Sequence, residues 1–191
     1  ATVRLAQTLG LTNHVMKPSV IIIGTNHFVQ TGEARYSAAQ RAAFSNVLLK
    51  AIKKYRIKLI AEEMSEDALS DYGVTQTLAK GIANSTEIGH SYIELTAPER
   101  RAMGINRLNL HQAAQSSGLS PAQACTLETL IGQVRETVWL LRILQKNTWP
   151  VLLICGANHG NRMEYLFNSI GKLCLLEVND YDAQPAPHKP E

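Results

Sequence analysis

Apolar and polar positions follow two patterns along the chain, one typical of strands and one typical of helices. Apolar or mixed runs predict five strands, at about 19–24, 57–61, 90–95, 151–155 and 173–178. Helical periodicity and helix-start residues predict helices at about 37–55, 65–69, 74–84, 120–147 and 161–170, and a further helix that begins near Pro98. Strands that alternate with helices favour right-handed crossovers and a parallel sheet. We therefore expect an α/β fold, a single domain with a mainly parallel sheet of about five strands flanked by helices.

The remaining segments set the domain boundaries. Residues 1–179 fit one α/β domain, since a chain of 191 residues can bury one substantial core. Residues 104–120 show no clear pattern and are a candidate lid or insertion. Residues 180–191 hold three prolines and are predicted to be a disordered tail. In the helix at 120–147 we expect one apolar face, formed by Leu127, Leu130, Ile131, Val134, Val138, Leu141 and Leu144.

The four-residue pattern Gly-x-x-His occurs twice, each time directly after an apolar run. The first copy spans Gly24 to His27 and the second spans Gly156 to His159. Apolar runs of this kind are typical of strands buried on both faces of a parallel sheet. Open α/β folds bind their ligands at the carboxyl ends of such strands. The two histidines are therefore predicted to share one site.

An acidic pair completes the candidate chemistry at this edge, because Glu62 and Glu63 follow the second predicted strand. Two imidazoles and one carboxylate are a common ligand set for a catalytic divalent metal ion such as Zn, Mn, Co or Fe. We expect His27, His159 and Glu63 to hold the ion, or Glu62 in place of Glu63, with the other glutamate as general base.

The turns around the two histidines supply further candidate residues. Gly24 and Gly156 would let the backbone turn sharply and approach a ligand closely. Asn26 and Asn158 would orient the histidines or donate hydrogen bonds to a substrate. We assign these four residues to the substrate pocket.

The long helix carries Arg135 and Glu136. Arg135 lies at helical spacing from Ile131 and Val138, so it would point towards the sheet and stabilise an oxyanion or bind a substrate carboxylate. The alternative is a surface ion pair with Glu128 or Glu136. Glu136 is a candidate catalytic residue beside Arg135, and its alternative is a solvated helix residue.

The order of these motifs resembles the TraB/TIKI superfamily, which includes ChaN-like and erythromycin-esterase-like proteins. Those proteins carry two Gly-x-x-His motifs, an acidic residue between them, and an arginine on a helix before the second motif. The matching positions in this chain are Gly24, His27, Glu62 or Glu63, Arg135, Gly156 and His159. Residues 60–65, 98–105 and 135–140 are more similar still to a group of small bacterial proteins in that superfamily. The resemblance implies hydrolysis without fixing the substrate.

Composition and net charge exclude several other classes of protein. The chain is 45% apolar and 18% charged, as in an ordinary globular protein, and its net charge of +3 is too small to indicate nucleic-acid or membrane binding. Three cysteines without close pairing favour a reduced, cytoplasmic setting over a disulfide scaffold. No stretch has the pattern of a signal peptide. The expected partner is a small-molecule or peptide substrate, and a homo-oligomer stays open.

The function that we expect is therefore that of a metal-dependent hydrolase. Two alternative functions remain. In a metal-free hydrolase, one histidine would act as general base and the other as general acid. In a non-catalytic sensing domain, the same pocket would bind a nucleotide or another small molecule. The sequence holds no GxGxxG pattern or P-loop, which weakens the nucleotide version.

Overall fold

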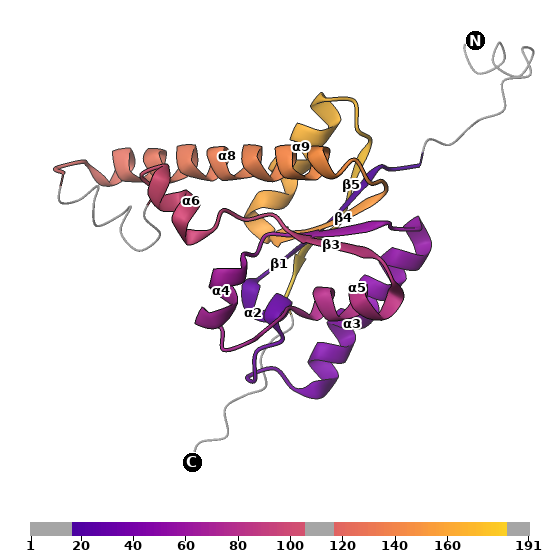
Figure 1. Cartoon of the computed structure of the whole chain (residues 1–191). Helices are drawn as coiled ribbons and strands as arrows, with labels where there is room; N and C mark the ends of the chain where they lie inside the picture. The colour runs from indigo at the N-terminus through magenta and orange to yellow at the C-terminus, as the bar shows by residue number, and fades with distance from the viewer. Residues whose placement is uncertain (1–16, 106–116, 183–191) are drawn as a thin grey trace, which may run out of the picture.

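The structure, a computed structural model, describes residues 17–105 and 117–182. These residues form a single-domain α/β fold around a five-stranded sheet that is parallel throughout (Figure 1). The strands are β1 (Val20–Thr25), β2 (Leu59–Glu62), β3 (Gly89–Tyr92), β4 (Val151–Gly156) and β5 (Cys174–Tyr181), in the order β3-β2-β4-β1-β5. The predicted fold class is therefore confirmed.

Helices cover both faces of the sheet. They are α2 (His27–Thr31), α3 (Ala38–Tyr55), α4 (Glu66–Asp71), α5 (Leu78–Thr86), α6 (Ala97–Ala102), α8 (Pro121–Lys146) and α9 (Gly160–Ser169), with a short 3-10 turn, η1 (Ala157–His159). Figure 1 shows α3 and α5 on one side of the sheet and α8 and α9 on the other. No helix among residues 17–105 and 117–182 is long and apolar enough to cross a membrane.

Alternating side chains of the strands build a separate core on each face. Ile21, Ile23 and Ile60 belong to the apolar cluster with α3 and α5. Val20 and Ile22 belong to the cluster with α8 and α9. Because β1 and β4 lie in the interior of the sheet, their residues are buried on both faces, as the continuous apolar runs predicted.

The buried face of α8 differs from the predicted one. Leu130, Val134 and Leu141 are exposed, although they belong to the expected apolar stripe. The buried residues of α8 are instead Ala124, Glu136, Trp139, Leu140 and Ile143. In Figure 1 the amino-terminal part of α8 extends beyond the sheet, so apolar positions there have no sheet to cover. Leu141 lies near the other end of α8 but outside the face that Trp139, Leu140 and Ile143 bury.

The carboxyl-terminal boundary also differs from the expectation. Strand β5 continues to Tyr181, so the chain is still paired with β1 at residues where the tail was expected to begin. The rest of that tail, residues 183–191, and residues 106–116 of the candidate lid lie outside the described residues.

Gly24 is required by the sheet rather than by a ligand. A Cβ atom at this position would lie 2.1 Å from the backbone oxygen of Asn179 in β5. The close approach of Gly24 is therefore to a neighbouring strand.

Candidate functional site

The carboxyl ends of three adjacent strands bring the predicted residues together. Strands β2, β4 and β1 are neighbours in the sheet. Glu63 directly follows β2, and His159 lies in η1 directly after β4. His27 is the first residue of α2, which begins two residues after the end of β1. The backbone N–H of Glu63 donates to the Ile154 oxygen at 2.8 Å, which extends the sheet pairing by one residue and fixes this glutamate at the edge. The structure thus brings the two predicted histidines together at one edge of the sheet.

Both imidazoles face the same carboxylate oxygen, Glu63 Oε1. The Nε2 atom of His27 lies 3.8 Å from it and the Nε2 atom of His159 lies 3.6 Å from it. The Glu63 side chain is only 2% exposed, whereas the side chains of His27 and His159 are 32% and 20% exposed. The site therefore joins a buried carboxylate to two histidines that solvent can reach.

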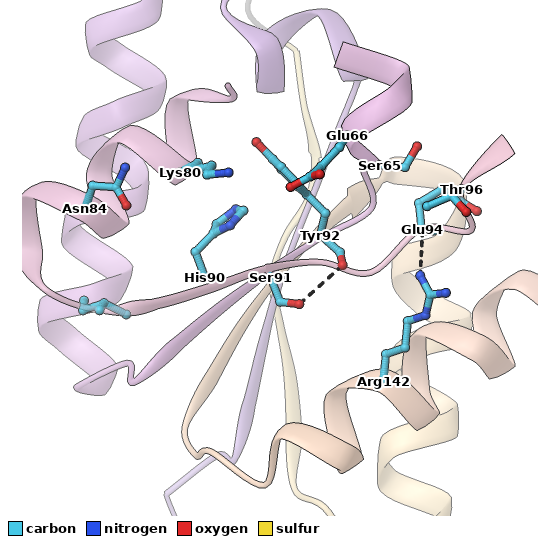
Figure 2. A pocket seen from close by; sticks show the side chains of 11 residues that line it. Ser65, Glu66, Lys80, Asn84, His90, Ser91, Tyr92, Glu94, Thr96 and Arg142 are labelled. Carbon is cyan, nitrogen blue, oxygen red and sulfur yellow. Dashed lines mark hydrogen bonds between the residues drawn. The ribbon is translucent and has the colours of Figure 1, made fainter. Parts of the chain in front are cut away.

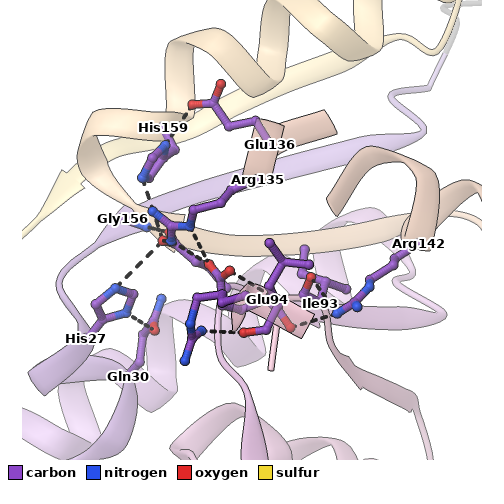
Figure 3. Close-up of polar contacts among 12 residues, drawn as sticks. His27, Gln30, Ile93, Glu94, Arg135, Glu136, Arg142, Gly156 and His159 are labelled. Atoms are coloured by element: carbon purple, nitrogen blue, oxygen red, sulfur yellow. Dashed lines mark hydrogen bonds and ion pairs between the residues drawn. The ribbon is translucent and has the colours of Figure 1, made fainter. Parts of the chain in front are cut away.

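The other ring nitrogen of each histidine is held by a helix residue, which lies in α2 itself for His27 and in α8 for His159 (Figure 3). His27 Nδ1 donates to Gln30 Oε1 at 3.0 Å, and His159 Nδ1 donates to Glu136 Oε1 at 2.7 Å. With the proton on Nδ1, a neutral imidazole presents a free lone pair at Nε2. Both lone pairs are then directed towards Glu63.

Arg135 brings a positive charge to Glu63. Its Nη2 atom donates to Glu63 Oε1 at 2.7 Å, and its Nε atom donates to Glu94 Oε2 at 3.0 Å. Burial disfavours the charged form, but the bonds to Glu94 and the charges of Glu94 and Glu63 outweigh it and raise the pKa of Arg135. The orientation towards the sheet is confirmed, because both of these carboxylates lie beyond the ends of sheet strands.

Glu136 is buried, so its interpretation as a solvated residue is wrong. It is 4% exposed, and its two carboxylate oxygens lie 2.7 Å from His159 Nδ1 and 2.7 Å from Arg162 Nε. Trp139, one turn further along α8, places its ring edge-on to His159 with the centroids 4.9 Å apart. Glu136 and Trp139 thus fix His159 from the α8 side.

The pKa of His159 follows from these neighbours. Burial lowers this pKa, but the hydrogen bond to Glu136 and the charge of Glu63 outweigh burial and the nearby Arg135, so that the pKa is raised above 6.5. A raised pKa contributes stability that is complete below the unfolded value and is lost as pH rises through the folded value.

We expect Glu136→Gln to lower the pKa of His159, because an amide oxygen stabilises the imidazolium less than a carboxylate does. The measurement is an NMR titration of the His159 ring proton in protein freed of metal by EDTA. The His90 ring, which does not contact Glu136 in the described structure, serves as an internal reference. An unchanged His159 titration would show that Glu136 does not control its proton.

Gly156 contributes a backbone donor rather than an approach to ligand. Its N–H donates to Glu63 Oε2 at 2.6 Å, and a Cβ atom at this position would lie 3.3 Å from the same oxygen. Asn158 is exposed. The side chain of Asn26 caps α2 by accepting from the Val29 N–H at 2.9 Å, so it positions the helix that carries His27.

Glu62 lies apart from this centre. Its Oε2 atom accepts hydrogen bonds from His90 Nε2 at 2.7 Å and from the Thr77 hydroxyl, and the residue is fully buried. Of the two adjacent glutamates, the structure thus brings Glu63 to the histidines and Glu62 to His90. The role of general base that was expected for the second glutamate has no geometric support at Glu62.

The donor atoms around Glu63 Oε1 approximate the ligand set of a small divalent cation. Ligand atoms bound to one tetrahedral ion lie roughly 3.3 Å from one another. The two N···O separations, 3.8 and 3.6 Å, exceed this by a few tenths of an ångström. As they stand, no three His, Cys, Asp or Glu side chains in residues 17–105 and 117–182 are arranged as a metal site. Two imidazole lone pairs beside a carboxylate nevertheless favour a positive species between them, which makes the chemistry of the donor set suitable.

Three supporting residues, Gln30, Glu94 and Trp139, belong to no motif that marks them in the sequence. Gln30 lies three residues after His27, and this spacing would have placed both side chains on one face if the short helix α2 had been predicted.

Comparisons with family models, with curated protein sequences and with solved structures find no match to this chain.

Proposed function

We propose that the protein is a hydrolase whose centre is formed by His27, Glu63, His159 and Arg135, and that it works with a divalent metal ion. The convergence of two imidazole Nε2 atoms on one buried carboxylate oxygen carries this proposal. The motif order, with Gly-x-x-His before and after the helix that holds Arg135, supports a further proposal that the chain belongs to the TraB/TIKI superfamily.

His27 Nε2, His159 Nε2 and Glu63 Oε1 would hold the ion. A bound divalent ion supplies Lewis acidity and lowers the pKa of a coordinated water. The chain itself fixes the ligands through Gln30 and Glu136. Such outer contacts set the tautomer and orientation of a ligating imidazole.

Arg135 would bind the negative charge that develops on the substrate. Its Nε and one terminal nitrogen already bond Glu94 and Glu63, which locks the plane of the guanidinium. A guanidinium carries five N–H donors, so others remain for a carboxylate or an oxyanion. Because the side chain is 26% exposed, a substrate can reach it.

A metal-free hydrolase is the second candidate, and two observations favour it. Arg135 already partly neutralises Glu63, and the pKa of His159 is raised. In this version the more exposed His27 would take a proton from the attacking water. His159, as the imidazolium, would give its proton to the leaving group.

The test is the metal content of tag-free protein, measured by mass spectrometry after incubation with Zn, Mn, Co or Fe. We expect near-stoichiometric binding of one of these metals, lost in the His27→Ala, His159→Ala double variant. His90→Ala is the matched control and should keep the metal, because His90 contacts Glu62 rather than Glu63.

Three other outcomes decide between the rivals. Hydrolysis of a test substrate that survives exhaustive chelation would favour the metal-free version. Ligand binding without hydrolysis of any ester or peptide in a broad panel would favour the sensing domain. Equal loss of metal in the His90→Ala control would show that the proposed ligands are wrong.

A further inference from the structure

A cavity of about 480 Å³ lies beside strand β3, and Glu94 forms part of its wall (Figure 2). Strand β3 is at the edge of the sheet, outside β2. Helix α5 contributes Lys80 and Asn84 to the cavity, and the start of α4 contributes Glu66. The two histidines of the hydrolase centre do not line it. It is therefore a separate candidate binding site.

His90 and Tyr92 line this cavity, and contacts with neighbouring residues hold both rings in place. His90 is held by the buried carboxylate of Glu62, at 2.7 Å from Nε2 to Oε2. The rings of His90 and Tyr92 meet edge to face with centroids 4.6 Å apart, and the Tyr92 hydroxyl accepts a bond from the Thr77 N–H at 3.3 Å. A ligand would thus meet a preformed aromatic surface.

Two charged groups of the cavity already have partners. Glu94 bonds Arg135 and the Leu95 N–H, the latter at 2.7 Å. Arg142 bonds Glu99 and the backbone oxygen of Glu94, the latter at 2.7 Å. These groups shape the wall but have little capacity to neutralise a ligand.

Lys80 and Glu66 differ from Glu94 and Arg142, because neither of them forms an ion pair with any described residue. The ammonium of Lys80 lies 5.0 Å from the centroid of the Tyr92 ring. Figure 2 shows Lys80 and Asn84 on one side of the cavity and Glu66 with Ser65 on the other. The cavity therefore presents one cation and one anion from two different helices.

We propose that this cavity binds a small zwitterion of the α-amino-acid class. The ligand carboxylate pairs with Lys80 and receives the amide N–H of Asn84, while the ligand ammonium pairs with Glu66. A ligand with a single charge would leave one of the two protein charges without a partner, so the zwitterion is favoured over either half. This inference is independent of the hydrolase proposal.

The experiment is calorimetric titration of the full chain with L-glutamine, L-serine and L-leucine, and with two singly charged derivatives of L-glutamine. N-acetyl-L-glutamine keeps only the carboxylate, and L-glutamine amide keeps only the ammonium. We expect saturable binding of L-glutamine and binding of both derivatives weaker by about tenfold or more, since each lacks one charge-assisted contact.

Lys80→Gln and Glu66→Gln should each weaken L-glutamine binding by about tenfold or more. Lys53→Gln, an exposed lysine on α3, is the matched control and should bind as the unmodified chain does. The His27→Ala, His159→Ala variant should also retain binding, which separates this cavity from the hydrolase centre. Both cavity side chains lie at the surface of their helices, and circular dichroism checks that the variants are folded.

Several results would overturn the proposal. These are no saturable binding of L-glutamine, L-serine or L-leucine, equal binding of either singly charged derivative, or binding that both cavity variants leave unchanged. Loss of binding in the double histidine variant alone would place the ligand at the Glu63 centre and overturn it as well.

Discussion

Arg135→Met is expected to lower the free energy of unfolding by about 3 kcal/mol, the loss typical of a buried ion pair from which one partner is removed. Arg135 is the residue that joins Glu63 to Glu94, and these two carboxylates have side chains only 2% and 7% exposed. Without the guanidinium, both remain buried near each other with no cation between them. We take the lower end of the usual range because the arginine itself is 26% exposed.

Urea unfolding followed by circular dichroism at pH 7 measures this loss. Arg101→Met is the matched control, since Arg101 is exposed on α6, and it should change stability by less than about 0.5 kcal/mol. Adding Glu63→Gln and Glu94→Gln to Arg135→Met should recover most of the lost stability, because the uncompensated charges are then gone. A loss in Arg135→Met no larger than in the control would contradict the assignment of Arg135 as their counter-ion.

The strands were predictable because the sheet is parallel and covered on both faces. Both faces of β1 and β4 are buried, so their sequences are continuous apolar runs bounded by turn residues. The edge strand β5 was harder to delimit. Its burial alternates along the strand, and its end at Tyr181 has no apolar run to mark it.

The buried face of α8 could not be derived from periodicity alone. Hydrophobic spacing indicates a face but not where the surface that it would cover ends, and the exposed Leu130 and Val134 show this limit. The buried face includes Glu136, a charged residue that is tolerated there because His159 and Arg162 pair with it. Both partners lie after β4, so no local pattern in the helix reveals them.

The sequence could place an acidic pair at the carboxyl edge of the sheet but could not show which of the two glutamates faces the histidines. Successive residues of a strand point to opposite faces of a sheet, so a shift of one residue in the end of β2 exchanges their environments. The register pairs Glu62 with Ile154 and Tyr92, and Glu63 follows beyond it. Only this register directs Glu63 to the histidines and Glu62 to His90.

The contrast between these two neighbouring glutamates also provides an activity test of the proposed hydrolase function. Under that proposal, Glu63→Gln should reduce the rate of hydrolysis by about a hundredfold to a thousandfold, the range for loss of one preorganised electrostatic group from a catalytic site. The amide cannot neutralise the histidines or a metal ion and pairs less strongly with Arg135. Glu62→Gln, one residue away, should leave kcat/KM within about threefold per folded molecule, since Glu62 contacts His90 and Thr77 rather than the centre.

The measurement is kcat/KM on the best substrate from a panel of aryl esters and chromogenic peptides, with the folded fraction of each variant determined by circular dichroism. Glu62→Gln is expected to lower the unfolding free energy, because Glu62 is fully buried and holds two hydrogen bonds. We therefore expect Glu63→Gln to lower kcat/KM, whereas Glu62→Gln should lower stability and leave kcat/KM nearly unchanged. An equal loss of kcat/KM in both variants would refute the assignment of Glu63 as the functional carboxylate and would move the chemistry to the whole acidic pair.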